Sequence, residues 1–297
     1  MPESGRDLTG RTDMDQLISP APDRRARQRR LGVVDGLGPQ ATARFYAMLC
    51  EHHRALTGGS SPDVTVHTIT VQRHLGRPAS TGLSRPGRPE GLPQLVTRTS
   101  RSLAGGGADV IAVACNATTI DPAAGAPACI GMVEATARTL QRLNVRRVRL
   151  LASSIMVSTA AYERGLGQVG VAVVAPAPRD QEIIDRFIES LRRSRIPVPI
   201  PGEVLRAITG LADDVDALLL DCAELSGVLD AEIAGKPVID SVRALVEHSC
   251  RALLDPGSEV AKPLAGTRPS SRWSLSGWRP YRPQRRAGEL VRVGDIP

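Results

Sequence analysis

The chain alternates short apolar runs with longer segments in which apolar residues recur every three or four positions. The short runs, rich in Val, Ile, Leu and Ala, have the length and composition of buried parallel strands, and the longer segments have the period of amphipathic helices. We predict strands at 31–34, 64–71, 108–114, 128–131, 148–151, 171–174, 217–220 and 237–240. We predict helices from residue 40 onward and at about 95–104, 133–143, 158–166, 181–193, 203–211 and 242–253.

This order of elements predicts an α/β fold with parallel sheets and right-handed crossovers. One unit of the pattern occurs twice: an apolar strand that runs into a cysteine, a turn-rich stretch, a short strand and an apolar-periodic helix. The repeat predicts two pseudo-symmetric domains. The first comprises residues 31–143 and is completed by the helix near 242–254, and the second comprises residues 144–240.

Composition and charge restrict the class of protein. Of 297 residues, 41% are apolar but only 2% are aromatic, so aliphatic side chains and alanine must fill the core. The net charge of +7 comes from the two ends, because residues 1–30 and 268–297 each carry an excess of arginine over acids. A neutral body argues against a nucleic-acid groove on the folded part.

The two ends and one internal segment lack a regular pattern. Residues 1–30 are polar, and residues 262–297 are rich in Pro, Arg and Ser with interleaved Trp and Tyr; we predict disordered tails. Contact of the last segment with nucleic acid or membrane is the alternative. For residues 73–93 we predict a lid or binding loop. The arginines of this loop are either solvated or placed to bind a carboxylate by bidentate pairing; they are Arg73, Arg77, Arg85 and Arg88.

Five cysteines form no CxxC pair, and no apolar run approaches the roughly 20 residues of a membrane helix. We therefore expect a cytoplasmic protein with free thiols and no membrane partner. The five histidines show no HxxxH or HExxH spacing, so no metal site is predicted.

Two of these thiols, Cys115 and Cys222, end the repeated strands. Stereochemical inversion at a carbon needs a base on one face and an acid on the other, and two opposed thiols supply both. A free thiol has a pKa of about 8.5, so one thiol must be shifted toward the thiolate, which a helix N-terminus favours. The alternative is that both are small core residues. The repeat favours the catalytic interpretation, whereas Cys50, Cys129 and Cys250 are assigned to the core.

Four motifs carry a resemblance to a known family. They are Asp35-Gly36-Leu37-Gly38-Pro39 followed by Ala41-Thr42, then Cys115-Asn116, Met132 to Ala137, and Cys222-Ala223-Glu224-Leu225. Over roughly residues 31–254 the chain resembles the cofactor-independent aspartate/glutamate racemase superfamily, most closely its aspartate racemase branch. The resemblance implies two flavodoxin-like domains with the active site between them. It also implies an amino-acid racemase or epimerase without cofactor, aspartate or glutamate as the default substrate, and a homodimer.

The resemblance also implies the site residues. Cys115 and Cys222 are the catalytic pair, and the substrate-binding positions are Asp35, Gly36, Gly38, Thr42, Asn116, Ala117, Thr118, Ala223 and Glu224. In glutamate racemases a similar Asp supports proton transfer by the neighbouring thiol, although Asp35 has helix capping as its alternative role. The resemblance implies that Asn116 binds the substrate and that Glu224 orients the half-site of Cys222. The alternative is that both residues only stabilise turns or helix N-termini. The Gly36-x-Gly38 turn lacks the third glycine and the ribose acid of a dinucleotide site.

Several motif positions depart from the family. Ala117 and Ala223 replace threonines, Thr119 replaces a histidine, and Ile155-Met156 replaces a Gly-Thr pair. Because polar side chains that can bind a substrate carboxylate are replaced at several of these positions, the substrate could be less acidic or larger than aspartate. They also keep two alternatives open: another isomerase or a decarboxylase of the superfamily that uses one cysteine, and a binding protein that kept the fold without activity.

Overall fold

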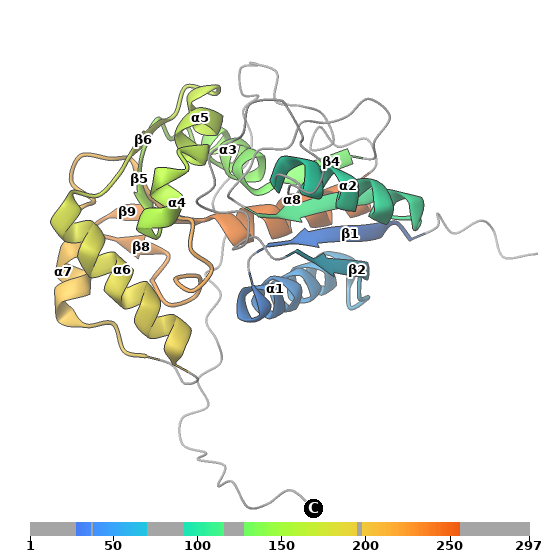
Figure 1. The fold of residues 1–297 in the computed structure, drawn as a ribbon, viewed down its shortest axis with the longest axis horizontal. Coiled ribbons are helices and arrows are strands. Elements are labelled where there is room, and N and C mark those ends of the chain that lie inside the picture. Colours follow the sequence, from blue (N-terminus) through green and yellow to red (C-terminus); the bar gives the residue numbers. More distant parts are fainter. Residues whose placement is uncertain (1–27, 37, 70–91, 116–127, 195–197, 256–297) are drawn as a thin grey trace, which may run out of the picture.

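The computed structural model describes residues 28–36, 38–69, 92–115, 128–194 and 198–255, which form two α/β units (Figure 1). The strands of the first unit are β1 (Arg30–Asp35), β2 (Asp63–Thr68), β3 (Val110–Ala114) and β4 (Ala128–Gly131). Its helices include α1 (Pro39–Thr57) and α2 (Leu92–Gly105). Pro39 stands in the first turn of α1, where its missing N–H costs nothing.

The chain enters the second unit through α3 (Met132–Arg142) and leaves it through α8 (Ser241–Leu254). The strands between them are β5 (Arg147–Leu151), β6 (Ala172–Val174), β7 (Ala217–Leu220), β8 (Glu232–Ile233) and β9 (Lys236–Asp240). The helices between them are α4 (Ser154–Ser158), α5 (Ala161–Gly167), α6 (Pro178–Arg193) and α7 (Gly202–Gly210).

The two sheets have the same strand order. The first runs β2-β1-β3-β4 and the second β6-β5-β7-β9-β8, and every pairing is parallel except that of β8 with β9. Apart from edge strand β8, each sheet follows the order 2-1-3-4, which is typical of flavodoxin-like domains. The predicted α/β class with pseudo-symmetric parallel sheets is confirmed. The short β8 was not predicted, because two residues give no readable period.

Helices α3 and α8 join the units. Val242 and Leu245 of α8 pack into the core of the first sheet, as expected for the helix that completes this domain. Val133 and Leu140 of α3 pack into the second core, while its Met132 packs into the first. Although the sequence suggested that α3 belongs to the first domain, it serves both cores.

Some predicted boundaries differ from the structure. The helix predicted at 158–166 begins only at Ala161, as α5, and the short α4 before it was not predicted. Ala160, in a left-handed conformation (φ 50°), separates the two helices. The first strand starts at Arg30, which was assigned to the disordered tail; its N–H donates to Asp109 Oδ2 at 2.8 Å. Strand β2 ends at Thr68. Residues 1–27, 70–91 and 256–297 lie outside the described residues, and with them the arginines of the predicted loop and the aromatic residues of the C-terminal segment.

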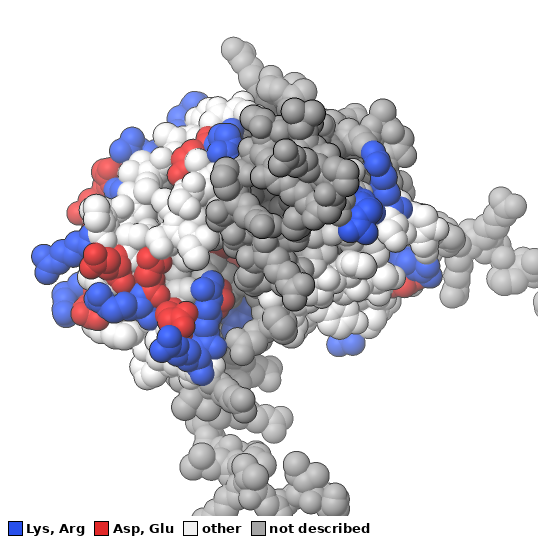
Figure 2. Space-filling view, in the orientation of Figure 1, with Lys and Arg blue, Asp and Glu red and all other residues white. Residues whose placement is uncertain are grey.

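Acidic and basic side chains are interspersed over the second unit on the face seen in Figure 2. This agrees with the neutral charge balance expected for the body from its sequence. Within the part of the chain that the structure describes, no helix combines the length and apolarity needed to cross a bilayer.

A buried histidine makes stability depend on pH. His248 on α8 is 2% exposed, and its Nε2 lies 3.3 Å from Thr139 Oγ1. Burial, followed by the charges of Arg142, Arg251 and Arg138, lowers the pKa of His248 to about 3. Unfolded histidine takes up a proton below about pH 6.5 while folded His248 does not, so the free energy of unfolding falls as pH falls between these values.

We expect His248→Gln to remove this contribution. Between pH 7 and pH 5.5 the wild-type protein should lose about 1.2 kcal/mol more of its free energy of unfolding than the variant does. Urea unfolding of both proteins at the two pH values measures the difference. Equal losses in the two proteins would show that His248 binds a proton equally well in both states.

Candidate active site

The carboxyl ends of the two sheets face one another. Strand β9 ends at Asp240, and the next residue begins α8, which packs on the first sheet. Strand β4 likewise ends at Gly131, directly before α3, which packs on the second. Since β3 is parallel to β4 and β7 is parallel to β9, β3 and β7 also end at the facing edges. Figure 1 shows α8 running along the first sheet, and α3 on the side of that sheet toward the second unit.

Both repeated cysteines therefore lie at facing sheet edges. Cys115 directly follows β3, and Cys222 comes two residues after Leu220, the last residue of β7. In each sheet the cysteine strand and its neighbour, β1 or β5, flank the point where the strand order reverses, which is where ligands bind in open α/β sheets. Ala223 packs into the core of the first unit, so the turn after Cys222 contacts both domains.

The first half-site brings Asp35 beside the cysteine strand. Asp35 ends β1 and is the register partner of Ala114, the residue before Cys115. The N–H of Gly36 donates to the carbonyl of Ala114 at 2.9 Å, which joins the Gly-rich turn to β3. Asp35 and Cys115 are both buried. The N-cap of α1 is Gly38 (φ 97°), which has no side chain that could cap the helix.

Thr42 is already engaged within α1. Its Oγ1 donates to the carbonyl oxygen of Gly38 at 2.7 Å, so binding of a substrate carboxylate by this hydroxyl requires that the hydroxyl first rotate. Asn116, Ala117 and Thr118, three of the residues implied by the resemblance, lie outside the described residues.

At the second half-site, which follows strand β7, three side chains are connected by hydrogen bonds. The Cys222 thiol donates to Glu224 Oε2 at 2.7 Å, and Arg192 Nε donates to Glu224 Oε1 at 2.7 Å. Burial, then the negative charge of Glu224, raises the pKa of Cys222 far above its usual value. Burial alone would raise the pKa of Glu224, but the hydrogen bonds from Cys222 and Arg192 outweigh it and lower that pKa. At neutral pH Cys222 is thus a thiol and Glu224 a carboxylate.

Arg192 was missed by the sequence analysis. It lies in the last turn of α6, about thirty residues before Cys222, in the pair Arg192-Arg193. Arg193 pairs instead with Glu189 on the same helix at 2.8 Å. Nothing in the spacing distinguishes the arginine that reaches the cysteine turn from its neighbour.

The turn that carries Cys222 is linked to the N-terminus of α8 by hydrogen bonds through Asp240. Ser226 Oγ donates to Asp240 Oδ2 at 2.5 Å, while Asp240 Oδ1 accepts the N–H groups of Val242 at 2.9 Å and Arg243 at 3.3 Å. Asp240 is therefore the N-cap of α8 and the anchor of the turn. Its burial raises its pKa despite these bonds.

Of the remaining cysteines, Cys129 and Cys250 pack with hydrophobic clusters, whereas Cys50 is half-buried. All five cysteines are free. Burial raises the pKa of Cys129 to about 11 and that of Cys250 to about 12, so both are protonated thiols. No group of three or more His, Cys, Asp and Glu suited to a metal ion occurs within the described ranges.

A cavity of about 280 Å³ opens between α1 and the turn after Cys222. Its walls include Arg44 and Met48 of α1, with Ser226 and Asp240 opposite. Neither Cys115 nor Cys222 lines it, so the cavity lies beside the predicted thiol site rather than within it.

Two flavodoxin-like domains, each with a cysteine beyond a central strand of its sheet, define a two-domain α/β protein. The model of the Asp/Glu/hydantoin racemase family matches residues 34–249, and the chain belongs to this family. The family resemblance seen in the sequence is thereby confirmed.

Solved structures share the fold. A candidate Asp/Glu racemase from Yersinia pestis is 23% identical, with a TM-score of 0.63 over 76% of this chain and 100% of that chain. An aspartate racemase homologue from Pyrococcus horikoshii OT3 is 19% identical, with a TM-score of 0.61 over 76% and 100%. Aspartate racemase from Picrophilus torridus is 20% identical, with a TM-score of 0.53 over 79% and 98%.

Proposed function

We propose that the protein is a cofactor-independent amino-acid racemase or epimerase that inverts the α-carbon with Cys115 and Cys222. The observation that carries this proposal is the repeat of one thiol beyond the central strand of each of two facing sheets. The family supports a racemase, and the structure supports an acid at the second half-site, because Cys222 is held as a thiol by Glu224.

The proposed reaction is a pair of proton transfers. The Cys115 thiolate takes the α-proton and leaves a carbanion, and Cys222 returns its own proton to the opposite face. The enzyme then holds a Cys115 thiol and a Cys222 thiolate, which is the arrangement required for the reverse direction. The α-proton of the product comes from the enzyme and hence from solvent.

We propose aspartate or glutamate as the default substrate, in line with the family and with the relatives' names. Gly38 is the N-cap of α1, and the N-terminus of a helix favours a carboxylate. The alanine at position 223 leaves the half-site of Cys222 less polar than the family motif. Cytoplasmic location and a homodimer remain part of the proposal.

The unlike surroundings of the two thiols favour one alternative, an isomerase or decarboxylase of the same fold in which a single cysteine reacts. The Cys222 thiol is hydrogen-bonded to the carboxylate of Glu224, which in turn accepts from the guanidinium of Arg192. Cys115 instead has Asp35 on the neighbouring strand. Strongly unequal effects of replacing the two cysteines would favour this alternative.

The decisive experiment is a screen of D- and L-amino acids in deuterium oxide with the full chain. Mass spectrometry should detect deuterium at the α-carbon, and chiral chromatography should detect the opposite enantiomer. An amino acid that acquires deuterium and inverts at matching rates identifies the substrate. Binding of an amino acid with no exchange at carbon would contradict the proposal and favour a binding protein.

Asp35 offers a second test. If it supports proton transfer by Cys115, Asp35→Asn should lower kcat about 100-fold while KM changes little, because general acid–base assistance contributes at about this level. Steady-state kinetics of inversion give both constants. Unchanged turnover in a folded Asp35→Asn enzyme would assign Asp35 to structure alone.

A further inference from the structure

Glu224 links the second thiol to a residue outside the cysteine motif. Its two carboxylate oxygens have separate partners: Oε2 accepts from Cys222 and Oε1 accepts from Arg192, each at 2.7 Å. The Glu224 side chain is 20% exposed and that of Arg192 is 46% exposed. The pair therefore lies at the border between the buried thiol and solvent, where a charge pair is only partly screened.

We propose that Arg192 is a positioning residue that acts through Glu224 to keep Cys222 a correctly oriented proton donor. The inference rests on the proposed two-thiol function and adds to it a residue from α6. Arg192 has no contact with the sulfur; it fixes the carboxylate that does.

Helix α6 holds the backbone of Arg192 in a fixed position. Ile184, Phe187 and Ile188 of α6 are buried in a cluster with residues of β7, so the backbone that carries Arg192 is held by packing. A cation is also favoured in the last turn of a helix. With Oε1 held from α6, Oε2 is directed at Cys222, and the thiol hydrogen has a defined acceptor.

The charges explain why a cation is needed. Once Cys222 has given its proton to the carbanion, a thiolate lies next to the Glu224 carboxylate, and like charges at this distance repel strongly. The guanidinium of Arg192 offsets this repulsion. Without it, burial would favour uptake of a solvent proton by Glu224. A neutral Glu224 is a weaker acceptor for the Cys222 thiol hydrogen, so the thiol of the resting enzyme would lose its defined orientation.

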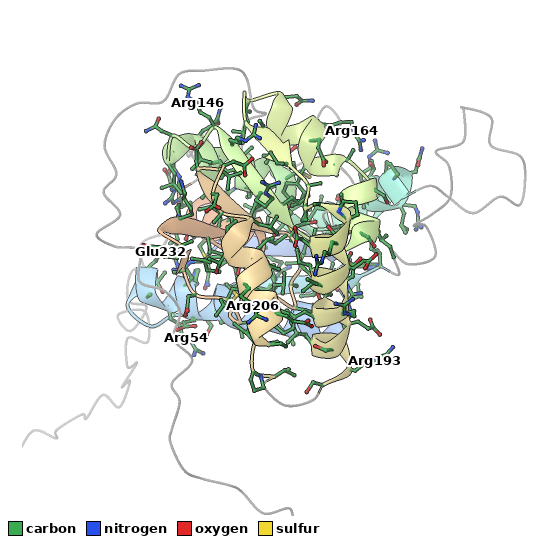
Figure 3. The ribbon with its side chains drawn as sticks, turned by 90° about the vertical axis from the view of Figure 1, so that its left-hand side faces the viewer. Arg54, Arg146, Arg164, Arg193, Arg206 and Glu232 are labelled. Atoms are coloured by element: carbon green, nitrogen blue, oxygen red, sulfur yellow. The ribbon has the colours of Figure 1, made fainter. Side chains whose placement is uncertain are left out.

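The charged groups around Glu224 are few among the described residues. Cys222 and Arg192 contact it, and Glu189 of α6 acts on Arg192 from one turn earlier. Glu189 is itself paired with Arg193, whose side chain is 79% exposed and points outward from the end of α6 (Figure 3). Arg193 is thus a matched control: the same residue type, one position away, without the carboxylate contact.

The first test needs no substrate. Proteins labelled with ¹³C at the glutamate carboxyl carbons are titrated by NMR, and the Glu224 signal is assigned by its loss in Glu224→Gln. We expect the Glu224 midpoint to move upward in Arg192→Gln, because burial remains and the guanidinium is gone. Arg193→Gln should leave it in place. A Glu224 midpoint in Arg192→Gln equal to that of the wild type would overturn the inference.

The second test uses the inversion reaction of the same proteins. We expect Arg192→Gln to lower kcat roughly tenfold, to shift the acid limb of the kcat profile to higher pH and to leave KM nearly unchanged. A rise in KM alone, with the pH profile of the wild type, would make Arg192 a substrate ligand and overturn the positioning role. Absence of inversion in the wild type would refute the proposed function, whereas the NMR titration would still decide the Arg192 contact.

Discussion

Alanine in place of either Cys115 or Cys222 is expected to lower the rate of inversion by about 10³-fold or more, because each direction of the reaction needs both a base and an acid. The two single variants should differ in exchange. The enzyme that keeps one thiol can still remove and return a proton on one face of the α-carbon. We therefore expect slow α-deuterium exchange in one enantiomer without inversion, and in the opposite enantiomer for the other variant.

Cys129→Ala is the control for these variants, since Cys129 sits on β4 with its pKa raised by burial and has no counterpart in the second domain. It should retain most of the inversion rate. Chiral chromatography and mass spectrometry of the α-deuterium follow both processes in one sample. A Cys115→Ala, Cys222→Ala double variant that still racemises would rule out the two-thiol mechanism.

The apolar pattern was sufficient to predict the fold, because the central strands β1, β3, β5 and β7 are buried and nearly all pairings are parallel. The strand predicted at 217–220 is found as β7 at the same residues, and the repeat around the two cysteines reappears as two sheets of equal order. The sequence could not reveal that α3 packs on both cores. The spacing of its apolar residues predicts an amphipathic helix, but it does not show which sheet each of these residues contacts.

The candidate site was predictable only where it follows the strands. Asp35 ends β1 and Cys115 follows β3, so parallel pairing brings these two to one sheet edge, and Cys222, after β7, lies at the equivalent edge of the other sheet. Glu224 was expected to orient the second half-site and does contact Cys222, but its partner Arg192 comes from a helix whose rotation about its axis depends on tertiary packing. A pair of adjacent arginines does not tell which one faces the carboxylate.

Gly165→Ala is expected to destabilise the junction of α3 and α5 by about 1–2 kcal/mol, since overpacking of a filled core outweighs the better helix propensity of alanine. A Cβ at Gly165 would lie 2.3 Å from Val133 Cγ1, and Val133 is itself buried in the second core. Because α3 directly follows β4, displacement of α3 would also disturb the edge of the first sheet that carries Cys115. Urea unfolding measures the loss, and the inversion rate reports the disturbance.

Two further variants separate overpacking from a general effect of alanine in α5. A Cβ at Gly167, two residues further along the same helix, meets no atom within 4 Å, so Gly167→Ala should leave stability unchanged or raise it by up to about 1 kcal/mol. Val133→Ala removes the methyl group that the added Cβ of Gly165→Ala would meet, so the double variant should be more stable than the sum of the single changes by about 1 kcal/mol or more. Additive effects would mean that the helices separate freely at this point, and α3 would then not be held tightly enough to fix the relative position of the two sheets.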